Sequence, residues 1–307
     1  MRLATQFLGL KLENPLVLAS GILGTTGASL AKVAKSGAGA VTSKSVWRNR
    51  HDGHANPTVI DLGNGNLINA VGLPHGGLEE AKIEFASFRK LSKKPLFASV
   101  AASSQNEFAE TVAAVAALEP DLIELNISCP NVEAEFGRPF ACDLKSAHEV
   151  TKLAKKAAGK IPLAVKLSPN VENIAAIART VAAAGADAIT AINTVGPGMV
   201  IDIETAEPIL ANRVGGLSGP AIRPLAVKAI FEIFRAVKIP IIGTGGVANG
   251  RDAIEFLEAG ATLVGIGSAA KDGPEIFADI EKEIVEFCRR KKMKNVADLI
   301  GLAHKNV

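Results

Sequence analysis

Residues 241–269 have the sequence IIGTGGVANGRDAIEFLEAGATLVGIGSA, which contains one strand–helix–strand unit. Its two ends, 241–246 and 263–269, are short runs that are apolar on both faces, as parallel strands covered by helices are. The middle, 251–260, has the apolar spacing of a helix and closes on a glycine suited to end it. The segment therefore predicts an α/β protein with a parallel sheet.

The same alternation continues toward the N-terminus. Six further apolar runs predict strands, at LVLA (16–19), VTSKSV (41–46), LFASVA (96–101), LIELNIS (122–128), LAVKLS (163–168) and AITAINT (188–194). Segments with helical spacing, such as 108–119 and 173–185, separate them. Eight strands alternating with helices predict a (β/α)8 TIM barrel. An open doubly wound sheet is the alternative, and the lack of a GxGxxG turn after the first strand disfavours it.

The spacing of the strands also predicts where the barrel is extended. The units after strands 2, 4 and 6 are longer than the others, so we expect insertions there. The segment TQFLGLKLEN (5–14) predicts a small N-terminal hairpin that closes the bottom of the barrel. No interdomain linker is visible, and residues 1–307 are expected to form a single domain.

Composition excludes several classes of function. Lys plus Arg is 34 and Asp plus Glu is 31, and this near balance (net charge +3) gives no reason to expect a nucleic-acid or membrane-surface partner. The three cysteines, Cys129, Cys142 and Cys288, have no CxxC spacing, which argues against a disulfide framework, a zinc site or an iron–sulfur cluster on this chain. No export signal or membrane-spanning run is visible, and we expect a cytoplasmic protein.

Glycines at the ends of the last two strands predict a phosphate site. GTGG (243–246) and GIGSA (265–269) each end a strand and open onto a helix, where backbone N–H groups and the helix dipole favour an anion. The loops after strands 7 and 8 are the usual phosphate site of such barrels. Tight turns without a ligand are the alternative.

Two lysines, Lys44 and Lys166, interrupt strands that are otherwise apolar. A buried lysine is costly unless an anion or acceptor compensates it. The compensating group is either a bound cofactor or substrate that develops negative charge or, for Lys166, the carboxylate of Glu124 on strand 4.

Polar residues gather where strands end. Cys129 ends strand 4 near Asn126 and Asn131, where a thiol of ordinary pKa can act as a general base near neutral pH. A small buried cysteine is the alternative. Asn69, in INAVGLP (68–74), and Asn193, in INTVG (192–196), fall at corresponding places, and converging carboxamides suit a heterocycle with alternating C=O and N–H groups. His51, His54 and His75 lack metal-site spacing and are expected to be solvated loop residues.

The motifs together resemble those of class 1 dihydroorotate dehydrogenases, and the resemblance covers essentially the whole chain. The motifs that carry it are ASG (19–21), SKS (43–45), INAVGLP (68–74), LNISCPN (125–131), VKLSPN (165–170), INT (192–194), GGLSGPAIRP (215–224), GTGG (243–246) and GIGSA (265–269). Membrane-associated class 2 relatives carry a serine where Cys129 stands. The GGLSGPAIRP segment is most similar to the class 1B catalytic subunit, with the fumarate-using class 1A as the alternative.

The resemblance implies a set of ligand contacts and no metal. The FMN phosphate would be bound by Gly219, Gly245, Gly246, Gly267 and Ser268. The rest of the cofactor would contact Ser20, Lys44, Ser45, Asn126, Lys166 and Ile192. The substrate would contact Lys44, Asn69, Ala70, Val71, Gly72, Leu73, Asn126, Asn131, Asn193 and Thr194. One position departs from the pattern, because Ser99 stands where class 1B relatives often have an asparagine that contacts FMN.

The resemblance also implies a reaction and partners. FMN-dependent oxidation of (S)-dihydroorotate to orotate, in de novo pyrimidine (UMP) synthesis, would use Cys129 to remove the proton on carbon 5 while carbon 6 passes hydride to FMN. A homodimer would be joined as a heterotetramer by a second subunit carrying FAD and an iron–sulfur cluster, through which electrons reach NAD. A related dihydropyrimidine-type flavoenzyme and a non-catalytic phosphate- or flavin-binding barrel are the alternative interpretations.

Overall fold

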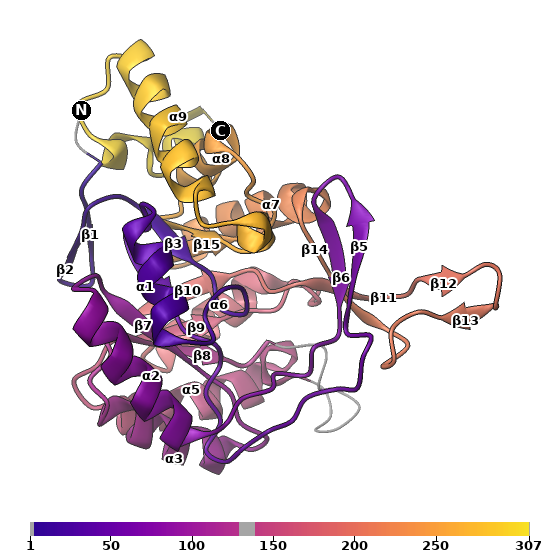
Figure 1. The fold of residues 1–307 in the computed structure, drawn as a ribbon. Coiled ribbons are helices and arrows are strands. Elements are labelled where there is room, and N and C mark those ends of the chain that lie inside the picture. The colour runs from indigo at the N-terminus through magenta and orange to yellow at the C-terminus, as the bar shows by residue number, and fades with distance from the viewer. Residues whose placement is uncertain (1–2, 129–138, 307) are drawn as a thin grey trace.

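Eight parallel strands close into a barrel in the computed structural model, which describes residues 3–128 and 139–306 (Figure 1). The barrel strands, in chain order, are β3 (Leu16–Leu18), β4 (Ala40–Thr42), β7 (Leu96–Val100), β8 (Leu122–Asn126), β9 (Leu163–Lys166), β10 (Ala188–Ala191), β15 (Ile241–Thr244) and β16 (Leu263–Ile266). The barrel closes where β16 pairs with β3, with Val264 opposite Leu16. The predicted (β/α)8 barrel is confirmed.

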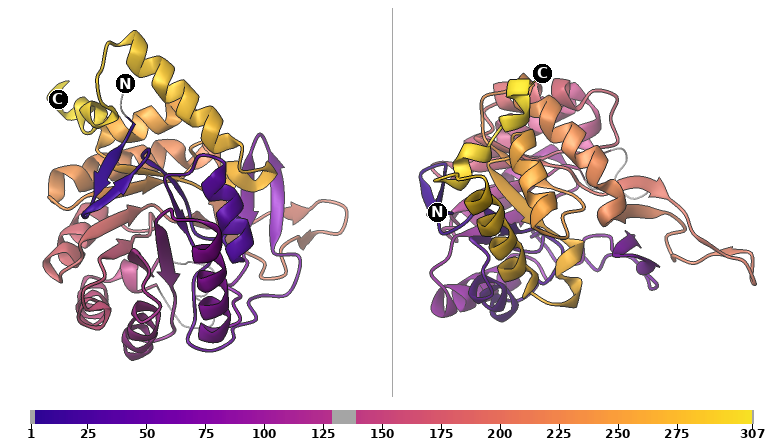
Figure 2. Two further views of the ribbon diagram at one scale, coloured as in Figure 1. Left: turned by 60° about the vertical axis from the view of Figure 1, so that its left-hand side comes forward. Right: turned by 90° about the horizontal axis from the view of Figure 1, so that it is seen from above.

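Helices follow the strands and surround the barrel (Figures 1 and 2). They are α1 (Gly27–Lys35), α2 (Leu78–Leu91), α3 (Gln105–Ala116), α5 (Leu144–Ala158), α6 (Ile174–Ala183), α7 (Arg223–Ala236), α8 (Gly250–Ala259) and α9 (Ile276–Arg290). Several begin at a side chain that accepts a hydrogen bond from the first turn; Ser104 and Asn249 do so at α3 and α8. Of the helices described, none combines the length and the apolar character needed to cross a membrane.

The barrel strands begin within one residue of their predicted starts but end earlier than predicted. Several residues beyond the strand ends stay buried, among them Ile127, Leu167 and Ile192. In the predicted strand 41–46 the Lys44 backbone N–H donates to the Gly24 carbonyl (2.8 Å). Pairing with β7 resumes at the Val46–Val100 bridge. An apolar run in the sequence indicates burial and not strand pairing, so the predicted strands extend beyond the observed ones.

The N-terminal hairpin closes the bottom of the barrel, as predicted. It consists of β1 (Thr5–Phe7) and β2 (Leu10–Leu12). Phe7 and Leu12 are buried in a cluster with residues from all eight barrel strands: Val17, Ala40, Phe97, Leu122, Ala164, Ala188, Ile242 and Leu263. A larger core fills the space between the barrel and its helices.

Inserted segments stand at the opposite end. After β4 come β5 (Val59–Gly63) and β6 (Asn66–Asn69), and after β10 come β11 (Val195–Gly198) and β14 (Gly215–Ser218). These four strands form one antiparallel sheet in the order β11-β14-β6-β5. A hairpin of β12 (Ile201–Asp202) and β13 (Glu207–Pro208) projects from it (Figure 2). The insertion after β8 lies mostly outside the described residues and ends in a short helical turn, Phe140–Cys142.

Candidate active site

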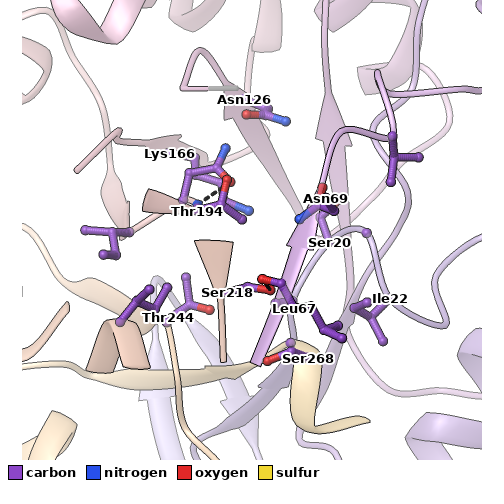
Figure 3. A pocket seen from close by; sticks show the side chains of 18 of the residues that line it. Ser20, Ile22, Leu67, Asn69, Asn126, Lys166, Thr194, Ser218, Thr244 and Ser268 are labelled. Atoms are coloured by element: carbon purple, nitrogen blue, oxygen red, sulfur yellow. Dashed lines mark hydrogen bonds between the residues drawn. The ribbon is translucent and has the colours of Figure 1, made fainter. Parts of the chain in front are cut away.

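A cavity of about 1150 Å³, including its mouth, lies at the carboxyl ends of the barrel strands (Figure 3). Its wall combines strand ends with residues of the inserted sheet, so segments far apart in the sequence meet there. Most of the residues that the sequence predicts to contact the cofactor or the substrate line this wall: Ser20, Lys44, Ser45, Asn69, Val71, Gly72, Leu73, Asn126, Lys166, Ile192, Asn193, Thr194, Gly219, Gly245, Gly246, Gly267 and Ser268. Ala70 lies behind the wall, packed with Ile68 and Leu210.

Several wall residues were not anticipated. They are Ala19, Gly21, Ile22, Val59, Leu67, Ser218, Ile222 and Thr244. Leu67 and Ser218 come from β6 and β14 and stand opposite each other in the inserted sheet. Such short strands carry no periodic signal of their own.

One end of the cavity is shaped by glycines. Gly246 has a φ of +86°, and a Cβ there would lie 2.7 Å from the Gly219 carbonyl oxygen and 2.8 Å from the Arg223 backbone nitrogen. Only glycine fits such a position. The Arg223 guanidinium is ion-paired with Asp252 and Glu255. An anion bound at this end would therefore rely chiefly on backbone N–H groups.

Two buried lysines belong to the same wall. Lys44 is 9% exposed and Lys166 is 6% exposed. The Lys166 Nζ lies 3.9 Å from Glu124 Oε1, close enough for an ion pair but too far for a hydrogen bond. The other Glu124 oxygen accepts a hydrogen bond from the Thr190 hydroxyl (3.0 Å). Lys166 therefore lies where either partner considered from the sequence can reach it, because it lines the cavity that would hold a ligand and is also ion-paired with Glu124.

A hydrogen-bonded chain of amides and hydroxyls crosses the strand ends. Ser99 and Ser45 join through their hydroxyls (2.9 Å), and the Asn126 Nδ2 donates to the Ser45 Oγ (3.2 Å). The Ser128 Oγ donates to the Asn126 Oδ1 (3.2 Å) and accepts from the Asn193 Nδ2 (2.9 Å). Ser99, which stands where class 1B relatives often have an asparagine, is not in the cavity wall, and its hydroxyl is hydrogen-bonded to that of Ser45.

The segment that carries Cys129 follows Ser128, a member of this hydrogen-bonded network, directly in the sequence. Cys129 and Asn131 lie outside the described residues. At the end of the insertion the Ala141 N–H donates to the Ile127 carbonyl (3.0 Å), so the chain returns to the end of β8. Cys142 lies near the Asn170 carbonyl (3.8 Å), away from the cavity wall.

The expectation of solvated histidines is wrong for His75. Its side chain is 7% exposed, and its Nδ1 accepts a hydrogen bond from the Gly77 N–H (2.9 Å). Burial lowers the pKa of His75; nearby Glu80 opposes this, and Lys44 adds to it. His51 stacks on Trp47, with ring centroids 4.3 Å apart, and the His54 ring contacts the Ala70 carbonyl (3.0 Å).

Comparison with known proteins places this cavity in a family context. The family model described as dihydroorotate dehydrogenase matches residues 2–288. A Methanosarcina mazei protein named dihydroorotate dehydrogenase B (NAD(+)), catalytic subunit, is 45% identical over 304 residues, which is 97% of this chain and 94% of that protein. A protein of the same name from Methanothermobacter thermautotrophicus is 42% identical over 98% of both chains. One from Pyrococcus horikoshii is 39% identical over 99% of this chain and 98% of its own.

Proposed function

The chain belongs to the dihydroorotate dehydrogenase family, and we propose that it oxidises (S)-dihydroorotate to orotate in de novo pyrimidine synthesis. The observation that carries this proposal is the cavity wall, which combines a glycine-lined end, two buried lysines and three asparagine side chains. Full-length similarity to catalytic subunits of the B type supports it.

We assign the cavity to FMN, held by a single barrel domain of residues 1–307. Gly219 and Gly246 belong to the cavity wall, where backbone N–H groups without side chains in the way would bind the phosphate. Gly245, Gly267 and Ser268 would complete that end. Ser20, Lys44, Ser45, Asn126, Lys166 and Ile192 would hold the remainder of the cofactor. When bound, FMN supplies the two-electron acceptor for the substrate.

The protein's own groups bind the substrate and move the proton. The amides of Asn69, Asn126 and Asn193 would pair with the substrate's carbonyl and N–H groups, and the Lys44 ammonium would favour its carboxylate. Val71, Gly72, Leu73 and Thr194 would complete that pocket, with Asn131 and the backbone of Ala70. Cys129, at the end of strand 4 in the sequence, is the proposed base for the carbon-5 proton.

The proposal extends to a partner. The relatives' names specify a catalytic subunit and NAD(+), which supports a second subunit that passes electrons to NAD. We propose that this subunit carries FAD and an iron–sulfur cluster and joins a homodimer of this chain in a cytoplasmic heterotetramer. The described residues contain no group of three His, Cys, Asp or Glu side chains arranged for a metal.

The test is turnover by the isolated chain. Under anaerobic conditions, dihydroorotate should bleach the yellow of the purified protein, and a dye should restore it. NAD should be reduced only after the partner subunit is added. Failure of dihydroorotate to bleach the flavin would contradict the activity, and bleaching by dihydrouracil instead would indicate a related dihydropyrimidine enzyme. Rapid NAD reduction by the single chain would contradict the two-subunit assembly, and rapid fumarate reduction would indicate class 1A.

A further inference from the structure

Ser128 has a buried hydroxyl that is hydrogen-bonded to two residues of the cavity wall but is not itself part of the wall. Its exposure is 0%, and it is not part of the cavity wall, whereas Asn126 and Asn193 both are. It follows β8 by two residues, whereas Asn193 follows β10. The hydroxyl therefore connects the ends of two barrel strands that are not neighbours, since β9 stands between them.

The direction of each hydrogen bond around Ser128 is fixed. A hydroxyl has one proton, and that of Ser128 is donated to the Asn126 Oδ1 (3.2 Å). The Ser128 oxygen in turn accepts from the Asn193 Nδ2 (2.9 Å). At their other ends, the Asn126 Nδ2 donates to Ser45 (3.2 Å) and the Asn193 Oδ1 accepts from the Thr194 N–H (2.8 Å). Rotating the Asn193 amide by half a turn would set its NH2 group against the Thr194 N–H. Rotating the Asn126 amide would leave the Ser128 proton without this acceptor.

An inventory of the two amides shows what they have left for a ligand. A carboxamide has two N–H donors and two oxygen lone pairs. Asn126 and Asn193 each spend one donor and one lone pair on the chain just described. Among the residues that the structure describes, no other group bonds to these two amides, so each keeps one donor and one lone pair. Such a pair matches a ring edge on which a C=O stands next to an N–H.

We propose that Ser128 is a positioning residue for the substrate, because its hydroxyl orients both amides for the C=O and N–H edge of a dihydropyrimidine. This role rests on the proposed function of the cavity. Without the hydroxyl, both amides can turn toward water and present the wrong group to the ring. The loss should affect binding of the pyrimidine and leave the glycine-lined end of the cavity unchanged.

The experiment compares Ser128→Ala with Ser168→Ala in the FMN-loaded protein. Ser168 is a matched control because it follows β9 by two residues, is 1% exposed, and has a hydroxyl that accepts a hydrogen bond from the Asn170 N–H (3.2 Å), away from both amides. Orotate affinity is measured from its perturbation of the flavin absorbance, and KM for dihydroorotate with a dye acceptor. Thermal melts and FMN content are recorded for each variant.

Ser128→Ala should weaken orotate binding and raise KM roughly tenfold or more, the scale of losing one to two oriented hydrogen bonds. Ser168→Ala should match the wild type, and Ser128→Thr, which keeps the hydroxyl, should recover most of the affinity. Unchanged orotate affinity in Ser128→Ala would overturn the inference, as would loss of the fold or of FMN in that variant, or equal weakening in Ser128→Thr. A wild-type protein inactive with dihydroorotate would instead reject the proposed function.

Discussion

Lys166 has a carboxylate on one side and the cavity on the other. Its ammonium lies 3.9 Å from Glu124, and both side chains are almost fully buried. Removing one partner of a buried ion pair leaves an uncompensated charge, whereas removing both charges avoids that cost. The two roles of Lys166 can therefore be separated by substituting its partner as well.

We predict that Lys166→Ala destabilises the FMN-free protein by about 3–5 kcal/mol, because Glu124 is left charged and buried. Adding Glu124→Gln should restore most of that stability, but FMN affinity should stay low in the double variant because the ammonium is still missing. Urea unfolding of the apo-protein and flavin titration give the two readouts. If the double variant regained wild-type FMN affinity, Lys166 would have only a structural role.

Cys129 is argued from its place in the sequence, after Asn126 and Ser128 at the end of strand 4. Replacing it with Ala should leave FMN bound but slow flavin reduction by dihydroorotate by roughly 100-fold or more, the usual cost of losing a general base. In the wild type the rate should rise with pH as the thiol ionises. Stopped-flow absorbance measures both, and a wild-type rate in the variant would assign the base elsewhere.

At the scale of elements, the segment between β6 and α2 is held by the neutral form of His75. Its Nδ1 accepts from the Gly77 N–H, and a proton on Nδ1 would end that bond. Glu80 lies 3.7 Å away, as in an ion pair, but such a pair needs the charged ring. Burial lowers the pKa of His75, so the neutral form is the one that the fold stabilises.

The pH dependence follows from that direction. Because the pKa is lower in the folded than in the unfolded protein, the stabilisation is present above the ordinary histidine pKa and is lost as the pH falls through the folded value. We predict that between pH 7 and pH 5 the wild type loses more unfolding free energy than His75→Asn, which keeps an acceptor but does not titrate. Urea unfolding at each pH tests this, and parallel curves would contradict it.

How much of this was predictable also depends on the element. The barrel strands and the residues at their ends follow from local patterns, since parallel strands present their carboxyl ends on one face. The burial of His75 does not, because it pairs with His51 across an isolated bridge and its ring bonds to Gly77, which caps the start of α2. Leu67 and Ser218 meet only through pairing between β6 and β14, which lie far apart in the chain. Long-range pairing of short strands leaves no trace in local periodicity.

At the scale of the whole molecule, the N-terminal hairpin that stabilises the barrel and the cavity that would bind ligands lie at opposite ends of the barrel. Phe7 is 1% exposed and packs against Phe97, with ring centroids 6.3 Å apart. Phe7→Ala should lower the unfolding free energy by about 3–5 kcal/mol through the void that it leaves. FMN affinity should be unchanged. Gln6→Ala, on the exposed face of the same strand, is the control, and unfolding curves that coincide for the two variants would contradict the hairpin's role.

The closed bottom of the barrel, the floor formed by the N-terminal hairpin, also constrains the order in which the chain can fold as it is synthesised. Phe7 leaves the ribosome early, but its cluster includes Leu263, and the first barrel strand pairs with the last. The floor therefore cannot be completed until nearly the whole chain has emerged. Until then the apolar side of the N-terminal hairpin lacks its full cover, and chains that stall before β16 should be prone to aggregate through it.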